Sequence, residues 1–264
     1  MKLRLVVGLG SALVLALALG GCFATNPLEP PAWTAPPGPP PSVQGALVDD
    51  MAVDPATGNI LTLSWDDSGG YGQVVGVLDS NFNELSATRL DPSVYASSVA
   101  PSGEGFALVS DGGSGNWRVD LDTGVATAVI GMGELASGPM AFFAAGDADG
   151  DAGSETVGMP CEFGAGDDMD VFDGEGNDRV LLARVSLDDS GLSGVSDTSV
   201  GAGIVWALGY EGPVGLDAMS GARVYEFTDS QSELFWNAST WAFDPVNNRL
   251  IIANYNGGFT VREL

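Results

Sequence analysis

Four carboxylates stand close together in the glycine-rich stretch 146–155. Asp147, Asp149, Asp151 and Glu155 occupy positions 1, 3, 5 and 9 of this run. Carboxylate oxygens spaced in this way can converge on one hard cation, and Ca²⁺ takes six to eight oxygen ligands. The spacing therefore predicts a calcium site formed by these four residues. The alternative is a solvated acidic loop, because the chain has 35 acidic residues and nine basic ones.

Other chemistry is restricted by what the composition lacks. The chain contains no histidine, and Lys2 is its one lysine. This excludes histidine-dependent nucleophile activation, histidine zinc sites and, once Lys2 is removed with the export signal described below, lysine Schiff bases. Carboxylate chemistry remains. Asp54 and Asp244 fall at equivalent positions of a sequence repeat, and the repeat itself explains why both positions carry an aspartate. We therefore predict no catalytic residue.

A repeat of about 46 residues must position these side chains. The first apolar residue after a turn recurs at intervals of 46, 51, 47 and 46 residues, at Ile60, Phe106, Val157, Ile204 and Leu250. Within each repeat, short β-rich runs alternate with clusters of Gly, Asp, Asn and Ser. Four short strands per repeat of this length are typical of β-propeller blades. We therefore predict an all-β fold for residues 43–264, a single β-propeller of about five four-stranded blades.

A Leu-Asp pair before a turn marks the end of a strand in four repeats, at Leu78-Asp79, Leu121-Asp122, Leu187-Asp188 and Leu216-Asp217. In the third repeat the marker follows its apolar anchor by 30 residues, against 12 to 18 residues elsewhere. We therefore predict an acidic insertion from Cys161 to Asn177, between the second and third strands of that blade. Cys161 is predicted to be a buried free thiol, with an intermolecular disulfide as the alternative.

Two repeats resemble a known family. Asp54–Ile60 and Phe243–Gly258 resemble the blade repeat of YVTN-type and lactonase-like β-propellers. This resemblance implies the propeller fold alone, because binding modules and enzymes share it.

The acidic loop also resembles a family motif, the calcium loop of FG-GAP propeller repeats. Phe142-Phe143 precede it and Val157-Gly158 follow it. Ala152 stands where those loops usually carry glycine, and Glu155 replaces their final aspartate. The loop is not an EF-hand, because position 12 is Gly158 and not a bidentate glutamate.

The last repeat stops at Leu264, where other blades end their third strand, so its outer strand is missing. We predict that Ser42–Val48 supplies this strand and closes the ring. The prolines just before this segment, Pro39 to Pro41, are poorly suited to a sheet.

The N-terminus has the pattern of an export signal. Lys2 and Arg4 precede an apolar run that ends at Leu19, shorter than the roughly 20 residues of a spanning helix. A spanning anchor is the alternative. Leu19-Gly20-Gly21-Cys22 resembles the bacterial lipobox, whose cysteine is diacylated and becomes the new N-terminus. This resemblance implies a signal peptide over residues 1–21, lipidation of Cys22 and, with Phe23 next, an outer-membrane location.

Residues 22–42 are predicted to be the lipidated cysteine and a disordered, proline-rich linker. Pro27 to Pro41 contains eight of the 15 prolines. Such a segment forms a semi-rigid polyproline-type tether of roughly 45 Å. A peptide ligand for an aromatic groove is the alternative.

The charge of the chain limits its partners. Removal of the signal leaves seven arginines against 35 acidic residues, a difference of −28. This field repels phosphate backbones, so no nucleic-acid partner is expected. We predict a lipoprotein anchored to the membrane in the periplasm or at the cell surface, acting as a non-catalytic module that binds a protein, polymer or small ligand. A propeller hydrolase, glycosidase or lactonase-like, that uses carboxylates or a bound metal is the alternative.

The tryptophans beyond the tether offer another candidate ligand surface, because aromatic rings stack on sugars. Most of them lie in strand-like runs, which favours packing in the core or between blades. They are Trp65, Trp117, Trp206, Trp236 and Trp241.

Overall fold

The computed structural model describes residues 42–66, 72–110, 116–128, 140–150, 155–160, 168–174, 180–187, 192, 195–209, 212–227, 235 and 237–264. All of them belong to the larger of two compact units, Thr34–Leu264. The predicted signal peptide, Cys22, the tether up to Pro41, Asp151, Cys161 and Trp236 lie outside the described residues. Among the described residues, no helix is long and apolar enough to cross a membrane.

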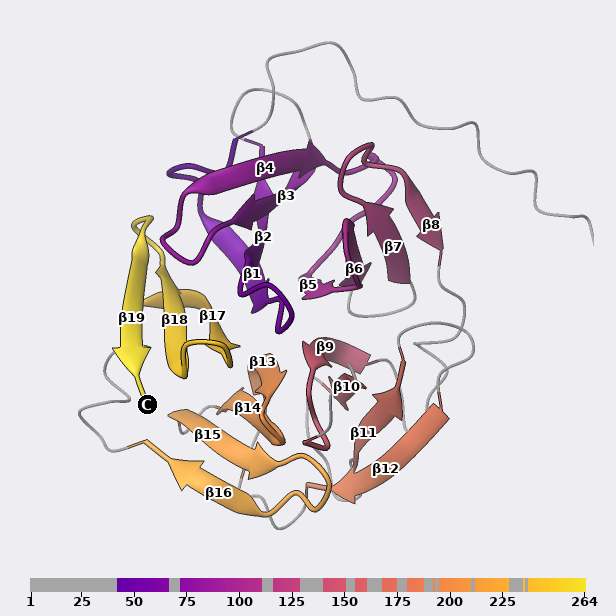
Figure 1. Cartoon of the computed structure of the whole chain (residues 1–264), viewed down its shortest axis with the longest axis vertical. Coiled ribbons are helices and arrows are strands. Elements are labelled where there is room, and N and C mark those ends of the chain that lie inside the picture. The colour runs from indigo at the N-terminus through magenta and orange to yellow at the C-terminus, as the bar shows by residue number, and fades with distance from the viewer. Residues whose placement is uncertain are drawn as a thin grey trace, which may run out of the picture. The chain divides into compact units, whose positions relative to one another are not determined.

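The described strands form five antiparallel sheets, four of four strands and one of three (Figure 1). We number these sheets as blades 1 to 5 in chain order. Blade 1 contains β1 Val48–Val53, β2 Ile60–Trp65, β3 Gln73–Leu78 and β4 Glu84–Arg89; blade 2 contains β5 Ser98–Pro101, β6 Phe106–Ser110, β7 Asn116–Asp120 and β8 Ala126–Ala128; blade 3 contains β9 Met140–Gly146, β10 Glu155–Pro160, β11 Asp168–Asp173 and β12 Val180–Ser186; blade 4 contains β13 Val195–Gly201, β14 Ile204–Gly209, β15 Gly212–Asp217 and β16 Arg223–Glu226; blade 5 contains β17 Ala238–Asp244, β18 Arg249–Asn254 and β19 Phe259–Glu263.

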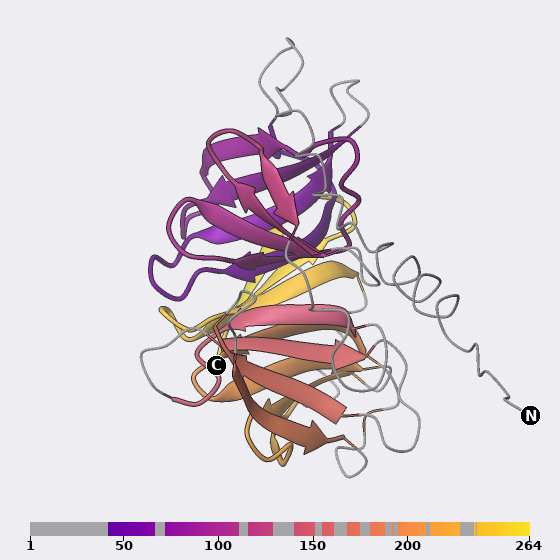
Figure 2. The ribbon, with the colours of Figure 1, turned by 90° about the vertical axis from the view of Figure 1, so that its right-hand side faces the viewer.

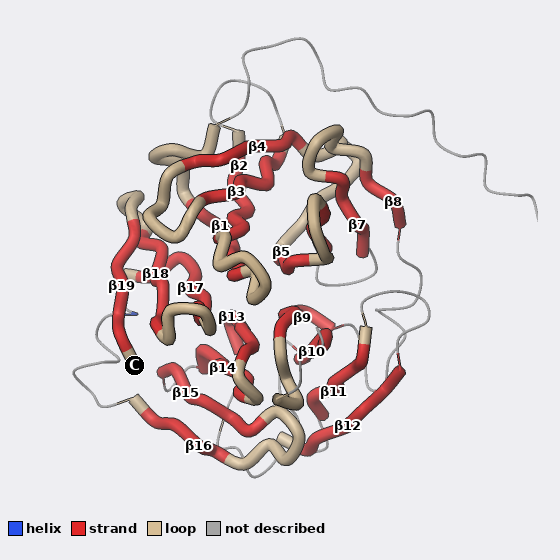
Figure 3. Tube along the Cα trace, in the orientation of Figure 1, coloured by secondary structure: helices blue, strands red, loops and turns tan. Residues whose placement is uncertain are grey.

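The blades stand around a common axis, with the first strand of each blade innermost (Figure 1). Figure 2 shows the same sheets from the side. Each of these inner strands, β1, β5, β9, β13 and β17, contacts the next, and β17 contacts β1. Turns and loops join the strands (Figure 3). The predicted all-β fold with five blades is therefore confirmed.

The second strand of each blade carries the repeat seen in the sequence. All five predicted anchors, Ile60, Phe106, Val157, Ile204 and Leu250, lie on second strands. These strands are packed on both faces, so they contain continuous apolar runs such as 250–253, whose four residues are buried. The core accordingly lies between blades, with separate clusters between blades 1 and 2, between blades 3 and 4, and across blades 4, 5 and 1.

Blade 3 differs from the prediction. The insertion predicted from Cys161 to Asn177 is wrong in its central part, because Asp168–Asp173 form β11. The Leu187-Asp188 pair, which the repeat predicts at the end of the third strand as in the other blades, follows the fourth strand, β12. The acidic residues of β11 suggested a loop, but Asp170 is fully buried and accepts a hydrogen bond from Nε of Arg184 at 2.8 Å.

Blade 5 has three strands among the described residues, as predicted, but the predicted donor of a fourth strand is wrong. Residues 42–47 are not a strand, and Val48 already belongs to β1. Ser42 Oγ and Val43 N donate to the Glu84 carboxylate at 2.8 and 2.9 Å. A Cβ on Gly76 would lie 2.5 Å from a Val43 methyl, so the absence of a side chain at Gly76 leaves room for Val43. The segment therefore packs on blade 1.

Side chains close the seam between blades 1 and 5. Phe82, in the β3–β4 turn, stacks on Phe259 of β19 with ring centroids 4.7 Å apart. Phe82 has a φ of 67°, a conformation that is strained for an aromatic residue. Arg249 of β18 donates to the Ser80 carbonyl, and its guanidinium lies 5.9 Å from the Phe82 ring centroid. These contacts stabilise the strained turn and join the two blades.

Candidate functional site

Four inner strands carry a β-bulge near their N-terminal ends, and three of these bulges precede residues of the site. In β1 the pairing shifts between Val48 and Asp50, in β13 between Val195 and Asp197, and in β17 between Ala238 and Thr240. A bulge re-aims the side chains beside it. The residues that follow the bulges, Asp50, Asp197 and Thr240, meet at the centre of the ring.

The hydroxyl of Thr240 joins the two carboxyl groups. Its Oγ1 lies 2.6 Å from Oδ2 of Asp197 and 3.3 Å from Oδ1 of Asp50. Both aspartates are 7% exposed. The hydroxyl has one hydrogen, so when it donates to Asp197 it can accept a hydrogen from a protonated Asp50. The arrangement is suited to holding one proton between two carboxyl groups.

The same carboxyl groups bind backbone N–H groups of neighbouring inner strands. Val99 N donates to Asp50 at 2.6 Å, and Trp241 N donates to Asp197 at 3.0 Å. Phe243 N donates to Ser199 Oγ at 2.9 Å, a second link between β13 and β17. An inner strand is the edge of its sheet, so these N–H groups need partners outside their own blade. We call this set of inner-strand links the inner belt.

Burial controls the protonation of the pair. It raises the pKa of Asp50 well above its ordinary value, and the nearby Asp197 raises this pKa further. Burial also raises the pKa of Asp197, to about 7, although hydrogen bonds from Thr240 and from two backbone N–H groups lower this pKa. Asp49, half-buried beside them on β1, has its pKa raised by burial. Two interacting carboxyl groups of this kind titrate as a unit and can serve as an acid and a base.

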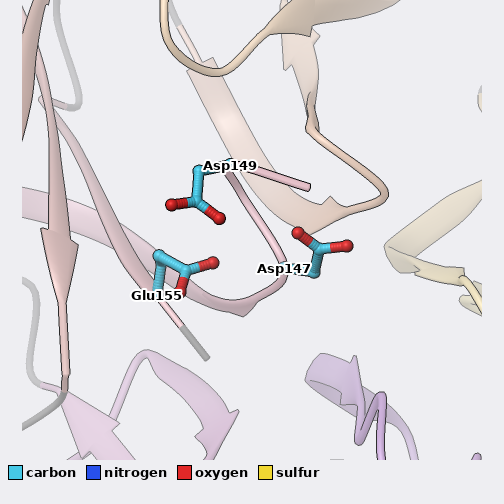
Figure 4. A group of neighbouring side chains, drawn as sticks. All are labelled: Asp147, Asp149 and Glu155. Atoms are coloured by element: carbon cyan, nitrogen blue, oxygen red, sulfur yellow. The ribbon is translucent and has the colours of Figure 1, made fainter. Parts of the chain in front are cut away.

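The predicted calcium loop is the second candidate site (Figure 4). The structure brings Asp147, Asp149 and Glu155 together, with one carboxylate oxygen of each within 4.8 Å of the others. Glu155 is buried at the start of β10, and its Oε2 accepts a hydrogen bond from Ala148 N at 2.8 Å. Gly150, with a φ of 88°, turns the loop, and its N–H donates to Asp147 at 2.7 Å. Three oxygen ligands of this kind suit a hard cation.

The turn carboxylates Asp54 and Asp244 have the structural role that the repeat predicts. Asp54 accepts from Ala56 N and from the Thr57 hydroxyl in the β1–β2 turn. Asp244 accepts from two backbone N–H groups in the β17–β18 turn and from Nε of Arg249.

The prediction that most tryptophans pack in the core or between blades is confirmed for three of the four described side chains. Trp206 and Trp241 are buried in the cluster shared by blades 4, 5 and 1. Trp117 is partly buried. Trp65, by contrast, is 46% exposed.

A pocket of about 410 Å³ lies at the outer edge of the ring, lined by 184–186 of blade 3 and 219–222 of blade 4. Its basic side chain, Arg184, is held by Asp170 of the same blade. The pocket is formed by the outer strand β12 and the β15–β16 turn, whereas the carboxyl pair is on inner strands.

Comparison with known proteins identifies the fold. No protein-family model matches the sequence, and no curated protein matches it. Glutaminyl cyclase from Myxococcus xanthus matches with a TM-score of 0.53 and 13% identity, over 85% of this chain and 94% of that chain. Virginiamycin B lyase from Staphylococcus aureus, a selenomethionine structure, has a TM-score of 0.43 and 10% identity, over 85% of this chain and 72% of that chain. Both are named as enzymes, and the first likeness agrees with the β-propeller fold of this chain.

Proposed function

We propose that this chain is a membrane-anchored lipoprotein whose propeller binds a partner in the periplasm or at the cell surface. In this proposal Cys22 carries the lipid, residues 22–42 form the tether, and the propeller is a non-catalytic binding module. The lipobox-like sequence and Phe23 support the anchor and its outer-membrane location.

The observation that carries the binding proposal is the bonding of the central carboxyl pair. Asp50 and Asp197 accept hydrogen bonds from backbone N–H groups of neighbouring blades. Their oxygens therefore serve to brace the ring. Binding is left to the exposed loops and edges, which a rigid scaffold presents well.

Fractionation of cells that produce the full-length protein tests the anchor. We expect the wild-type protein in the outer membrane and Cys22→Ser in the soluble or uncleaved precursor fraction. Ser42→Ala serves as a control that keeps the lipobox intact. Equal membrane attachment of Cys22→Ser and wild type would refute lipidation at Cys22.

A pull-down from detergent-solubilised envelope tests binding, with the full-length protein as bait. We expect a partner that stays bound when the carboxyl pair is changed by Asp197→Asn. A partner lost with Asp197→Asn while the protein stays folded would move the site to the ring centre.

We also propose that Ca²⁺ stiffens blade 3. Asp147, Asp149, Asp151 and Glu155 would hold it. The convergence of three of these carboxylates supports the site.

A carboxylate hydrolase, glycosidase or lactonase-like, is the second candidate function. It is supported by the convergence of Asp50 and Asp197 on Thr240, because acid–base pairs of unequal pKa are typical of hydrolytic sites. The test is turnover of 4-nitrophenyl glycosides and of γ-lactones by the full-length protein. An enzyme would lose turnover by 10²-fold or more in Asp50→Asn and Asp197→Asn. Ser199→Ala, in the same inner belt but without a carboxyl group, would retain it.

A further inference from the structure

One aromatic pair stands out on the described surface. Trp65 is the last residue of β2, and Tyr95 lies in the loop from β4 to β5. Their ring centroids are 5.9 Å apart and the planes are inclined by 54°. Trp65 is 46% exposed and Tyr95 61%. The two rings form an open, tilted pair.

The backbone segments that carry the two rings are joined by one buried side chain. Gln73 of β3 is paired with Trp65 across the β2–β3 ladder. Its buried side-chain amide donates to the Ala96 carbonyl at 2.7 Å and accepts from Ala96 N at 2.6 Å. One residue therefore fixes the strand that carries Trp65 and the loop that carries Tyr95. Preorganisation of this kind lowers the entropic cost of binding.

The overall charge of the chain favours a cation as the ligand of this pair. The chain carries a formal net charge of −26, which attracts cationic groups to its surface. The nearby guanidinium of Arg89 is buried and bonded through Nε to Asp66 at 2.9 Å, so it does not offer a competing cation at the surface. The faces of tryptophan and tyrosine attract ammonium and guanidinium groups through their quadrupoles.

We propose that Trp65 and Tyr95 receive an arginine or lysine side chain from a basic protein partner. This inference rests on the binding function proposed above and gives the chemistry of the partner. A planar guanidinium stacks on aromatic faces, and both rings are exposed to solvent.

Calorimetric titration of the detergent-solubilised full-length protein with a hexa-arginine peptide tests the proposal. We expect Trp65→Ala and Tyr95→Ala each to raise Kd by about three- to tenfold. The matched control is Tyr255→Ala, because Tyr255 is a surface tyrosine, 66% exposed, on the β18–β19 turn. This control should stay within about twofold of wild type. The titration is repeated at 0.5 M salt, where long-range attraction is screened.

An unchanged Kd in both variants would overturn the proposal. Equal binding of a hexa-citrulline peptide would do the same, because this peptide lacks the charge. Binding of maltohexaose through Trp65, in place of the cationic peptide, would also overturn it. Circular dichroism confirms that the variants are folded. A negative result here beside a positive envelope pull-down would reject the cationic partner and leave the binding function standing.

Discussion

Arg249 of the last blade donates through Nη2 to the backbone carbonyl of Ser80 in the first blade, at 2.8 Å. Its Nε donates to the buried carboxylate of Asp244 at the same distance. One side chain thus joins a turn of blade 1 to a turn of blade 5. The ring is held at this seam by side chains, where the sequence had suggested a shared strand.

Replacing Arg249 with alanine should lower the free energy of unfolding by about 2–3 kcal/mol, because it leaves Asp244 buried without its cation. Urea unfolding of the full-length protein measures the change. Arg223→Ala is the control, since its pair with Glu226 is exposed, and its loss should cost less than about 1 kcal/mol. Equal losses would show that the seam does not depend on Arg249.

Stability should fall as the pH rises from about 4 to about 7. The folded-state pKa of Asp197 is raised to about 7, and that of Asp50 is also raised. The unfolded carboxyls ionise near their ordinary values, so over this range the folded state binds more protons than the unfolded state. The stabilisation from holding a proton is complete below pH 4 and is lost toward pH 7.

Two variants, Asp50→Asn and Ser199→Ala, separate the contribution of the carboxyl pair to this pH dependence from that of the many other acidic residues. Asp50→Asn should reduce the loss of stability between pH 4.5 and pH 7.5, because it removes a carboxyl group whose pKa is raised in the folded state. Ser199→Ala removes a non-titrating link of the same inner belt, so it should lower stability equally at both pH values. Wild type and Asp50→Asn with parallel pH profiles would contradict a proton shared at Asp50.

Calcium should raise the melting temperature. Binding to the folded state alone stabilises by about 2.7 kcal/mol at one hundred times Kd, which corresponds to roughly 5–10 °C for a domain of this size. Differential scanning calorimetry with Ca²⁺ and with EDTA measures the shift. Asp149→Ala should abolish it, whereas Asp122→Ala, an exposed carboxylate of blade 2, should retain it. No shift in the wild type would refute the site.

A side chain at position 76 should expel the N-terminal segment from blade 1. The Cβ of Gly76→Ala would lie 2.5 Å from Val43 and 2.7 Å from Thr62 Oγ1. Such overpacking costs about 1–3 kcal/mol. Limited proteolysis should then cut near residues 42–47 more rapidly than in wild type.

The control for Gly76 is Gly72→Ala, whose Cβ would have no atom nearer than 3.8 Å. The double variant Gly76→Ala with Val43→Ala should recover part of the lost stability, because the clash with Val43 is removed. Protection from proteolysis equal to wild type in Gly76→Ala would show that Val43 does not hold the segment.

The fold was predictable because its signals repeat. Ile60 and Leu250 begin the apolar runs of second strands, which neighbouring blades bury on both faces. Turns fixed by Asp54 and Asp244 precede them. A long apolar run between turn residues is visible without knowledge of tertiary contacts.

The central carboxyl pair was not predictable in the same way. Comparison of the repeats aligned Asp54 with Asp244, which are turn residues, whereas Asp50 and Asp197 follow bulges that add a residue to their strands. The available signal was an acidic residue inside an inner strand. The hydrogen bond from Val43 N to the Glu84 carboxylate was not predictable for a related reason, because it depends on the space above Gly76, which only the tertiary structure defines.

The attachment of residues 42–47 to blade 1 also determines how mechanical load would enter the molecule. A pulling force on the N-terminal side would first act on the Glu84 contacts and on Val43. The ring closure at Arg249 and Phe82 is formed by other residues, so it would not lie at the point where the force enters. A propeller closed by its own N-terminal strand would transmit tension directly to its seam. In this chain the contacts that hold residues 42–47 on blade 1 and the contacts that close the ring involve different residues. The segment can therefore detach under tension while the ring remains closed.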